Sequence, residues 1–271
     1  MQQITSSEEL AVRASLQLVV LDDNSTPVSF GSGFIVLYNG RHFLMSVAHV
    51  TDMGSPYKIA IELGLATDER GVPLKPIGGL YHFDAFSIGD PSLVKEVEDL
   101  FKNGERLDIS FAELAVDFPL IQQELDFGAF KVEEGGKAIL EIKNIVQPTK
   151  GKKYCFFGRI RHKPTGLVKG NLPEIKMENT LKYGLDYLSS NEKFHRFLSR
   201  EVIYDSADYQ GCSGAPILDE NGCVVAIACA VRPNSKLVYG FPISWCLELV
   251  DQAMKIEALQ RNEGSTRPST S

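Results

Sequence analysis

The sequence has little positive charge for its length and no long apolar run. Its 271 residues include 28 Lys and Arg against 35 Asp and Glu, which gives a formal net charge of −7. Nucleic-acid binding depends on basic side chains that displace counterions from phosphates, so we expect no nucleic-acid partner. No stretch has the length and apolarity of a transmembrane helix, so we expect no membrane partner. The first ten residues lack the basic and apolar regions of a signal peptide.

Cysteine is also scarce, and its spacing excludes two common structural roles. The five cysteines are odd in number and include no C-x-x-C pair. We therefore expect neither a disulfide framework nor a structural zinc site. Free thiols suit a reducing compartment, so we expect a cytoplasmic protein, and no metal or other cofactor. The cysteines are Cys155, Cys212, Cys223, Cys229 and Cys246.

The chain does contain many short apolar segments separated by turn residues. Hydrophobic residues make up 44% of the sequence, enough for one large domain or two small ones with buried cores. Asn39-Gly40 separates two apolar segments and is a strong hairpin signal. Short strands with little helix indicate β-barrels rather than a parallel sheet. The predicted strands cover residues 16–21, 34–38, 41–45, 58–62, 79–82, 109–114, 138–142, 153–158 and 223–228.

Four segments carry the signals of helices. Ser6 and Glu9 form a capping box for a short N-terminal helix. Residues 90–104 have a cap, a first-turn proline and an apolar stripe, which predicts a helical insertion that packs on the outer wall or docks a partner. Residues 189–192 predict the cap of a helix ending at Leu198. Helical spacing from Ser244 onward predicts a C-terminal helix.

A polar connection at residues 143–153 divides the predicted strands into two groups. We therefore predict an N-terminal β-barrel at residues 1–145. A second β-barrel with the C-terminal helix follows at residues 152–260. The polar residues 261–271 are predicted to be a disordered tail.

Residues 210–216, with the sequence QGCSGAP, carry the strongest functional signal. Gly211 allows backbone angles that bring its N–H beside that of Ser213. Two such donors aimed at one point form an oxyanion hole, which stabilises the tetrahedral intermediate of acyl transfer. Gly214 leaves room for a substrate carbonyl against the serine. We therefore interpret Ser213 as a candidate nucleophile.

Two further segments supply the groups that a serine nucleophile needs. His49 follows a predicted strand, and an imidazole has an ordinary pKa near neutrality, which suits a general base. Asp108 opens another apolar run and is the candidate partner that orients the histidine. In chain order the three candidates are His49, Asp108 and Ser213, the order of the chymotrypsin arrangement.

These motifs resemble those of trypsin-like (chymotrypsin-fold) serine peptidases, nearest to bacterial Deg/HtrA-type protease domains without a PDZ domain. GSGFIV at residues 31–36 and SVAH at 46–49 are similar to the segments around the family's histidine. LDIS at 107–110 is similar to its D-I-A, and GCSGAP at 211–216 to its G-x-S-G-G-P, with Ala215 as a departure. The resemblance covers roughly residues 14–250. It implies an all-β fold of two six-stranded antiparallel β-barrels and a serine endopeptidase acting on proteins or peptides.

The resemblance also implies a substrate site. The backbone of Cys229, Ala230 and Val231 would pair with an extended substrate. The pocket for the residue before the cut would be lined by Ala207, Asp208, Cys229 and Gly240, and Gln210 is a further substrate-binding residue. Ala207 stands where trypsin keeps its buried acid, so we predict a neutral pocket that accepts Val, Leu or Ala. An inward-pointing Asp208 would instead favour Arg or Lys.

Three alternatives remain open at this stage. Cys212 is a second candidate nucleophile, although the flanking glycines suit Ser213 better. The chain could be a catalytically silent trypsin-like module that binds or senses within a larger assembly. A non-peptidase acyl hydrolase is the third alternative.

The residue before Ser213 also bears on activation. Trypsin-like zymogens use an acid there to receive a freed N-terminus, and Cys212 offers no carboxylate. We therefore expect no activation by N-terminal cleavage. Ordering of the oxyanion hole is assigned to residues 185–200 and 206–210 or to an activating protein partner, and idle forms would have the Gln210–Gly211 peptide flipped.

Overall fold

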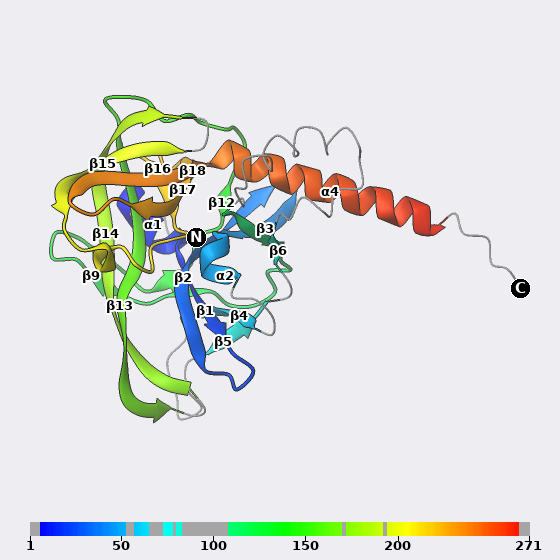
Figure 1. Cartoon of the computed structure of the whole chain (residues 1–271), viewed down its shortest axis with the longest axis horizontal. Coiled ribbons are helices and arrows are strands. Elements are labelled where there is room, and N and C mark those ends of the chain that lie inside the picture. The colour runs from blue at the N-terminus through cyan, green and yellow to red at the C-terminus, as the bar shows by residue number, and fades with distance from the viewer. Residues whose placement is uncertain are drawn as a thin grey trace, which may run out of the picture.

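The computed structural model describes residues 6–52, 57–64, 73–77, 80–82, 108–169, 172–191 and 194–265. Two groups of β-strands lie side by side, with a short N-terminal helix against the C-terminal group and a long C-terminal helix (Figure 1). The mostly β architecture agrees with the fold class predicted from the sequence. The helix predicted at residues 90–104 lies outside the described residues.

The N-terminal strands form one twisted sheet. Its order is β5-β4-β1-β2-β3-β7-β6, and β12 pairs with β2. Among the described residues, no ladder joins the end strands β5 and β6, which are three and two residues long. Over the described residues this half is therefore an open half-barrel, where we predicted a closed six-stranded barrel. The strands are β1 (Leu16–Leu21), β2 (Pro27–Tyr38), β3 (Arg41–Ser46), β4 (Lys58–Glu62), β5 (Leu74–Pro76), β6 (Tyr81–His82), β7 (Ser110–Glu113) and β12 (Leu140–Glu141).

The β2–β3 hairpin is confirmed. Asn39 and Gly40 have φ of 49° and 74°, the left-handed pair that a tight two-residue hairpin turn requires. The turn sets the register, and Phe34 faces Met45 across the ladder. Both side chains are fully buried, so the hairpin packs β3 against the core.

The C-terminal strands form the closed six-stranded barrel that was predicted, in the order β13-β14-β15-β18-β17-β16. The helix predicted to end at Leu198 is wrong, because β15 runs through this segment. His195 and Phe197 are buried while Arg196 and Leu198 are half-buried, the period-two pattern of a strand. The barrel strands are β13 (Lys153–Lys169), β14 (Leu172–Ser190), β15 (His195–Ile203), β16 (Pro216–Asp219), β17 (Val224–Val231) and β18 (Ser235–Pro242).

Between the two groups the chain forms two small ladders. Strand β8 pairs with β11, and β9 pairs with β10. These strands are β8 (Ile121–Gln122), β9 (Leu125–Asp126), β10 (Lys131–Val132) and β11 (Gly135–Gly136). The carbonyl groups of Gly136, in β11, and of Glu133, between β10 and β11, accept hydrogen bonds from Arg13 of the N-terminal helix.

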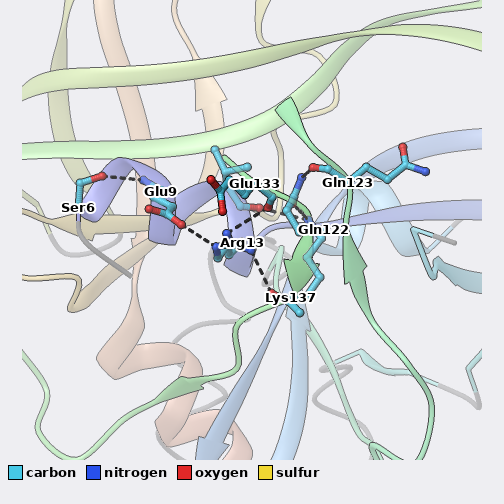
Figure 2. Close-up of polar contacts among 9 residues, drawn as sticks. Ser6, Glu9, Arg13, Gln122, Gln123, Glu133 and Lys137 are labelled. Carbon is cyan, nitrogen blue, oxygen red and sulfur yellow. Dashed lines mark hydrogen bonds and ion pairs between the residues drawn. The ribbon is translucent and has the colours of Figure 1, made fainter. Parts of the chain in front are cut away.

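Helix α1 (Ser7–Ala14) begins as predicted, with the Ser6 hydroxyl accepting a hydrogen bond from the Glu9 N–H at 3.1 Å. It packs against β13 and β16 of the C-terminal barrel. Figure 2 shows the polar contacts at its C-terminal end. Arg13 donates to the Glu133 carbonyl at 3.1 Å and also pairs with Glu9 at 2.8 Å. The first helix of the chain therefore belongs spatially to the second half of the molecule.

Lys137 lies beneath this helix. Its Nζ donates to the carbonyls of Val12 and Ser15, at 3.1 and 2.7 Å, and to Gln122 Oε1 at 2.6 Å. Burial lowers the pKa of Lys137 to about 7. The lysine thereby ties the connecting segment to the start of β1.

Helix α4 (Ile243–Ser265) closes the chain as predicted and runs away from the body of the molecule (Figure 1). It enters the predicted tail at residues 261–265, so those five residues are helical rather than disordered. The rest of that tail lies outside the described residues. No helix in the described part of the chain is both long and apolar enough to span a membrane.

One hydrophobic cluster joins the two halves. Phe34 and Phe111 from the N-terminal sheet and Phe157 and Phe241 from the barrel belong to the same buried cluster. A second cluster lies within the C-terminal barrel, and a third joins buried residues of β1, β2, β3 and β4 in the half-barrel. The predicted site residues lie on segments that come from both sides of this shared core.

Candidate active site

The strand register brings His49 and Asp108 together. Ser46, the last residue of β3, pairs with Ser110, the first residue of β7. His49 follows in the short helix α2 (Ala48–Thr51), and Asp108 lies just before β7. A buried hydrogen bond of 2.8 Å from the Thr51 hydroxyl to the Ser110 hydroxyl holds α2 against that strand.

The Asp108 carboxylate holds His49 at two points. Its Oδ2 lies 2.6 Å from His49 Nδ1, and its Oδ1 accepts the backbone N–H of His49 at 2.7 Å. A carboxylate at Nδ1 favours the tautomer that carries the ring proton there. The Nε2 atom of His49 is then the basic nitrogen, as general-base chemistry requires.

Ser213 lies in a tight loop between the 3₁₀ turn η2 (Ser206–Asp208) and β16. The loop is closed by backbone hydrogen bonds from Cys212 to Tyr209, at 2.9 Å, and from Ala215 to Cys212, at 3.0 Å. Among the described residues, the N–H groups of Gly211 and Ser213 have no acceptor. Two free donors beside the serine are what the predicted oxyanion hole needs.

Both glycines of this loop are required by the backbone. Gly211 has φ of +107°, and a Cβ there would lie 2.1 Å from the Arg159 carbonyl oxygen. Gly214 has φ of +91°, and its Cβ would lie 1.9 Å from the Ser32 carbonyl oxygen. Any side chain at either position would displace the loop, so the glycine pattern around Ser213 has a steric origin.

The Ser213 hydroxyl points to the neighbouring strand in this conformation. It donates to the Cys229 carbonyl at 3.4 Å, a long hydrogen bond. In the described residues no hydrogen bond joins it to His49. Catalytic hydrogen bonds are often long or misaligned without substrate, so this rotamer does not exclude Ser213 as a nucleophile.

Cys212 is not in a setting that activates a thiol. It is 2% exposed, and its Sγ packs against Gly158 of β13. Burial raises the pKa of Cys212 to about 12, so the thiolate is not populated near neutrality. These observations favour Ser213 over Cys212.

A pocket of about 290 Å³ opens beside Ser213. Among the residues predicted to bind substrate, Gln210, Cys229, Ala230 and Val231 line it. Its other lining residues are Phe156, Ser206, Tyr209, Cys212, Ser213, Ala228 and Val238. None of the lining side chains carries a formal charge.

Three predicted pocket residues lie elsewhere. Asp208 accepts a hydrogen bond from Arg161 at 2.5 Å and lines a separate surface pocket. Gly240 is a barrel residue whose Cβ would meet the side chains of Ala226 and Ile217, both at 2.9 Å. Ala207 is half-buried in η2, next to Ser206, which does line the pocket.

The sequence reasoning missed the residues that shape the pocket, notably Phe156, Tyr209 and Val238. A register shift in the β17–β18 ladder lies between Ala228 and Ala230 and leaves Val231 opposite Val238. The alternation of β18 could have suggested Val238. The register shift is a property of the pairing between β17 and β18, and the sequence of neither strand alone predicts it.

The comparisons with known proteins concern the fold. No family model matches the sequence, and no curated protein matches it either. A solved structure of a scabies mite inactivated protease paralogue, S-D1, is similar with a TM-score of 0.56 and 11% identity, over 93% of this chain and 95% of that one. A serine endoprotease from Yersinia pestis has a TM-score of 0.47 and 12% identity, over 94% of this chain and 68% of that one.

At 11% identity the likeness to the mite paralogue bears on the fold alone. The sequence motifs around His49, Asp108 and Ser213 define the candidate site, and the strand pairing defines the architecture. The chain has the chymotrypsin-like double-barrel fold, with one barrel closed and the other formed as a half-barrel.

Proposed function

We propose that this protein is a serine endopeptidase of the trypsin-like type, nearest to the Deg/HtrA-type protease domains whose motifs its sequence resembles. The observation that carries the proposal is the pair of His49 and Asp108, which are 59 residues apart in sequence and are joined by two hydrogen bonds. The same structure contains Ser213 in a glycine-flanked loop. The two free N–H groups of Gly211 and Ser213 add the electrostatic component.

In the proposed mechanism, the Ser213 hydroxyl turns from Cys229 toward His49. Ser213 Oγ attacks the scissile carbonyl while its proton passes to His49 Nε2. The carbonyl oxygen takes up the negative charge and accepts hydrogen bonds from the N–H groups of Gly211 and Ser213. His49 then gives the proton to the leaving amine, and water hydrolyses the acyl-enzyme in the same way.

The proposed substrate is an extended peptide with an apolar residue before the cut. Its backbone would pair with residues 229–231 of β17. The adjoining pocket has no charged lining residue, and Val231 and Val238, which pair across neighbouring strands, both line it. Val, Leu and Ala suit such a pocket, because a buried Lys or Arg would lack a counter-charge.

A catalytically silent binding module is the second candidate. One observation favours it, because the Ser213 hydroxyl is bonded to Cys229 rather than to His49. In that case the same cleft would hold a peptide without cutting it. The peptidase and the silent module differ in whether the Ser213 hydroxyl can turn to reach His49 Nε2.

Labelling with a fluorophosphonate distinguishes the peptidase from the silent module, because this probe reacts only with an activated serine. We expect the wild-type chain and Cys212→Ala to be labelled, and Ser213→Ala and His49→Ala to remain unlabelled. Turnover should fall by about 10⁶ in either triad variant, and by about 10⁴ in Asp108→Asn. Labelling that persists in Ser213→Ala and disappears in Cys212→Ala would refute the assignment of the nucleophile. An unlabelled wild-type chain that still binds peptides would favour the silent module.

A further inference from the structure

A buried serine of the N-terminal sheet contacts the loop that carries Ser213. Ser32, in β2, is 1% exposed. Its hydroxyl donates to the Gly211 carbonyl at 2.7 Å, and its N–H donates to the Ser213 carbonyl at 2.8 Å. Ser32 therefore bonds to residues on both sides of Cys212, across the boundary between the two halves of the fold.

Strand β3 supports this serine in turn. The Ser46 hydroxyl donates to the Ser32 carbonyl at 2.8 Å. Ser46 ends β3, three residues before His49. A chain of buried hydrogen bonds thus connects the strand that delivers the candidate base to the loop that delivers the candidate nucleophile.

The contact matters because of what glycine does to a loop. With φ of +107°, Gly211 is in a conformation from which the peptides on either side can rotate at little steric cost. The peptide between Gly211 and Cys212 is held at both ends, by the Ser32 hydroxyl and by the hydrogen bond from the Cys212 N–H to Tyr209. In the described residues, the Gln210–Gly211 peptide has no such bond, so its orientation depends on how Gly211 is held.

We propose that Ser32 is a positioning residue for the oxyanion hole. Its hydroxyl fixes the Gly211 carbonyl on the side of the N-terminal sheet, which keeps the Gly211 N–H turned toward the reacting carbonyl. Without this hydroxyl, the Gly211 oxygen loses a buried partner and the loop samples orientations in which one donor is lost. The inference rests on the proposed peptidase function and adds a residue from the half of the molecule that lacks the nucleophile.

The chain offers a matched control. The Ser15 hydroxyl donates to the Phe157 carbonyl at 2.9 Å, and it is also a buried serine bonded to a carbonyl of the other half. Phe157 lies on β13, outside the loop of Ser213. Ser15→Ala therefore removes the same kind of hydrogen bond without touching the proposed hole.

The first experiment compares Ser32→Ala with Ser15→Ala on a peptide amide substrate. We expect kcat in Ser32→Ala to fall by about 10- to 100-fold with KM within twofold, because a complete loss of one donor costs about 10²- to 10³-fold. Affinity for a peptide boronate, which mimics the tetrahedral state, should fall by the same factor as kcat/KM. Ser15→Ala should leave both quantities unchanged. Equal losses in the two variants, or a change in KM alone, would overturn the proposal.

The second experiment does not depend on activity. Hydrogen exchange of the Cys212 amide, measured by NMR, should accelerate at least tenfold in Ser32→Ala and stay unchanged in Ser15→Ala. An unchanged rate would refute the role of Ser32 even if the wild-type chain proved inactive. A wild-type chain that neither reacts with a fluorophosphonate nor binds the boronate would refute the proposed function instead. Accelerated exchange with unaltered kcat in an active enzyme would show that Ser32 holds the loop but does not position the hole.

Discussion

At the scale of single residues, the backbone around Ser213 requires glycine at two positions. Gly211 and Gly214 have positive φ, and their α-carbons lie against backbone carbonyls. Cys212 between them is buried, and burial raises the pKa of its thiol, so Ser213 remains the candidate nucleophile of the loop. The chemistry therefore depends on backbone shape as much as on the three titratable or nucleophilic side chains.

Gly214→Ala tests this steric requirement. We expect it to destabilise the fold by about 3–5 kcal/mol, because an added Cβ would lie 1.9 Å from the Ser32 carbonyl oxygen and φ is +91°. The matched control is Gly40→Ala, where φ is +74° but no heavy atom lies within 4 Å of the added Cβ. That variant should lose only about 1 kcal/mol, from the positive φ alone. Urea unfolding measures both, and equal losses would contradict the steric account.

A second residue-scale prediction concerns His162, whose ring stacks on Phe30 with centroids 4.4 Å apart. Burial, with Arg159 nearby, lowers the pKa of His162 to about 4. At pH values between this lowered pKa and the ordinary pKa of 6.5, His162 binds a proton in the unfolded chain but not in the folded chain. Stability should therefore fall as the pH drops from about 6.5 to 4.

His162→Phe removes this proton linkage and keeps the stacked ring. The buried Nε2 of His162 has no partner among the described residues, so no hydrogen bond is lost. We expect the variant to gain on the wild type as the pH falls, by up to about 2 kcal/mol at pH 4 after allowance for partial exposure. The measurement is urea unfolding of both proteins at several pH values. Parallel stability curves would show that His162 does not contribute.

At the scale of elements, the pocket is shaped by pairing between strands. Its walls come from β13, β17 and β18 and from the turn after η2. The shift between Ala228 and Ala230 leaves the Cys229 carbonyl facing Ser213. The same pairing places Val231 and Val238 at the pocket, so the shape of the pocket follows from the register of one ladder.

The position of Asp208 bears on whether the pocket suits apolar residues or Arg and Lys. Its carboxylate pairs with Arg161 at 2.5 Å, outside the pocket. A peptide-library profile should therefore show apolar residues before the cut, and Asp208→Ala should leave the profile unchanged. The control is Val238→Ala, which enlarges the pocket and should shift the profile toward larger apolar residues. A profile dominated by Arg and Lys and lost in Asp208→Ala would contradict this assignment.

At the scale of the whole molecule, segments cross between the two halves. Helix α1 precedes the N-terminal sheet in sequence but packs on the C-terminal barrel. The core cluster contains large side chains from both halves. Since His49 and Asp108 come from one half and Ser213 from the other, the geometry of the site depends on this shared interface.

Arg13→Met tests how much α1 contributes to that interface. Arg13 is 3% exposed, pairs with Glu9 and donates to the carbonyls of Glu133 and Gly136. We expect a loss of about 1.5–3 kcal/mol, because a buried guanidinium gives up its charge-assisted hydrogen bonds. Arg41→Met is the control, since Arg41 pairs with Glu113 at the surface, and it should cost about 1 kcal/mol or less. Similar midpoints of urea unfolding for the two variants would contradict this role of α1.

Several features of this protein follow from local sequence alone. The Asn39-Gly40 turn and the Ser6 cap each act over a few residues, where backbone sterics and short-range hydrogen bonds decide the conformation. The order His49, Asp108, Ser213 and its flanking residues were enough to select the candidate site and the fold class. The closed C-terminal barrel was predicted in the same way.

Other features exist only because distant strands pair. Residues 195–198 form a strand because β14 and β18 offer hydrogen-bonding partners on either side, which outweighs the local cap signal. Asp208 lies outside the pocket because Arg161, from β13, attracts its carboxylate. Ser32 reaches the loop of Ser213 across 179 residues of sequence. Tertiary contacts decide such features, because the energy of a hydrogen bond or a packed side chain depends on a partner that the local sequence does not contain.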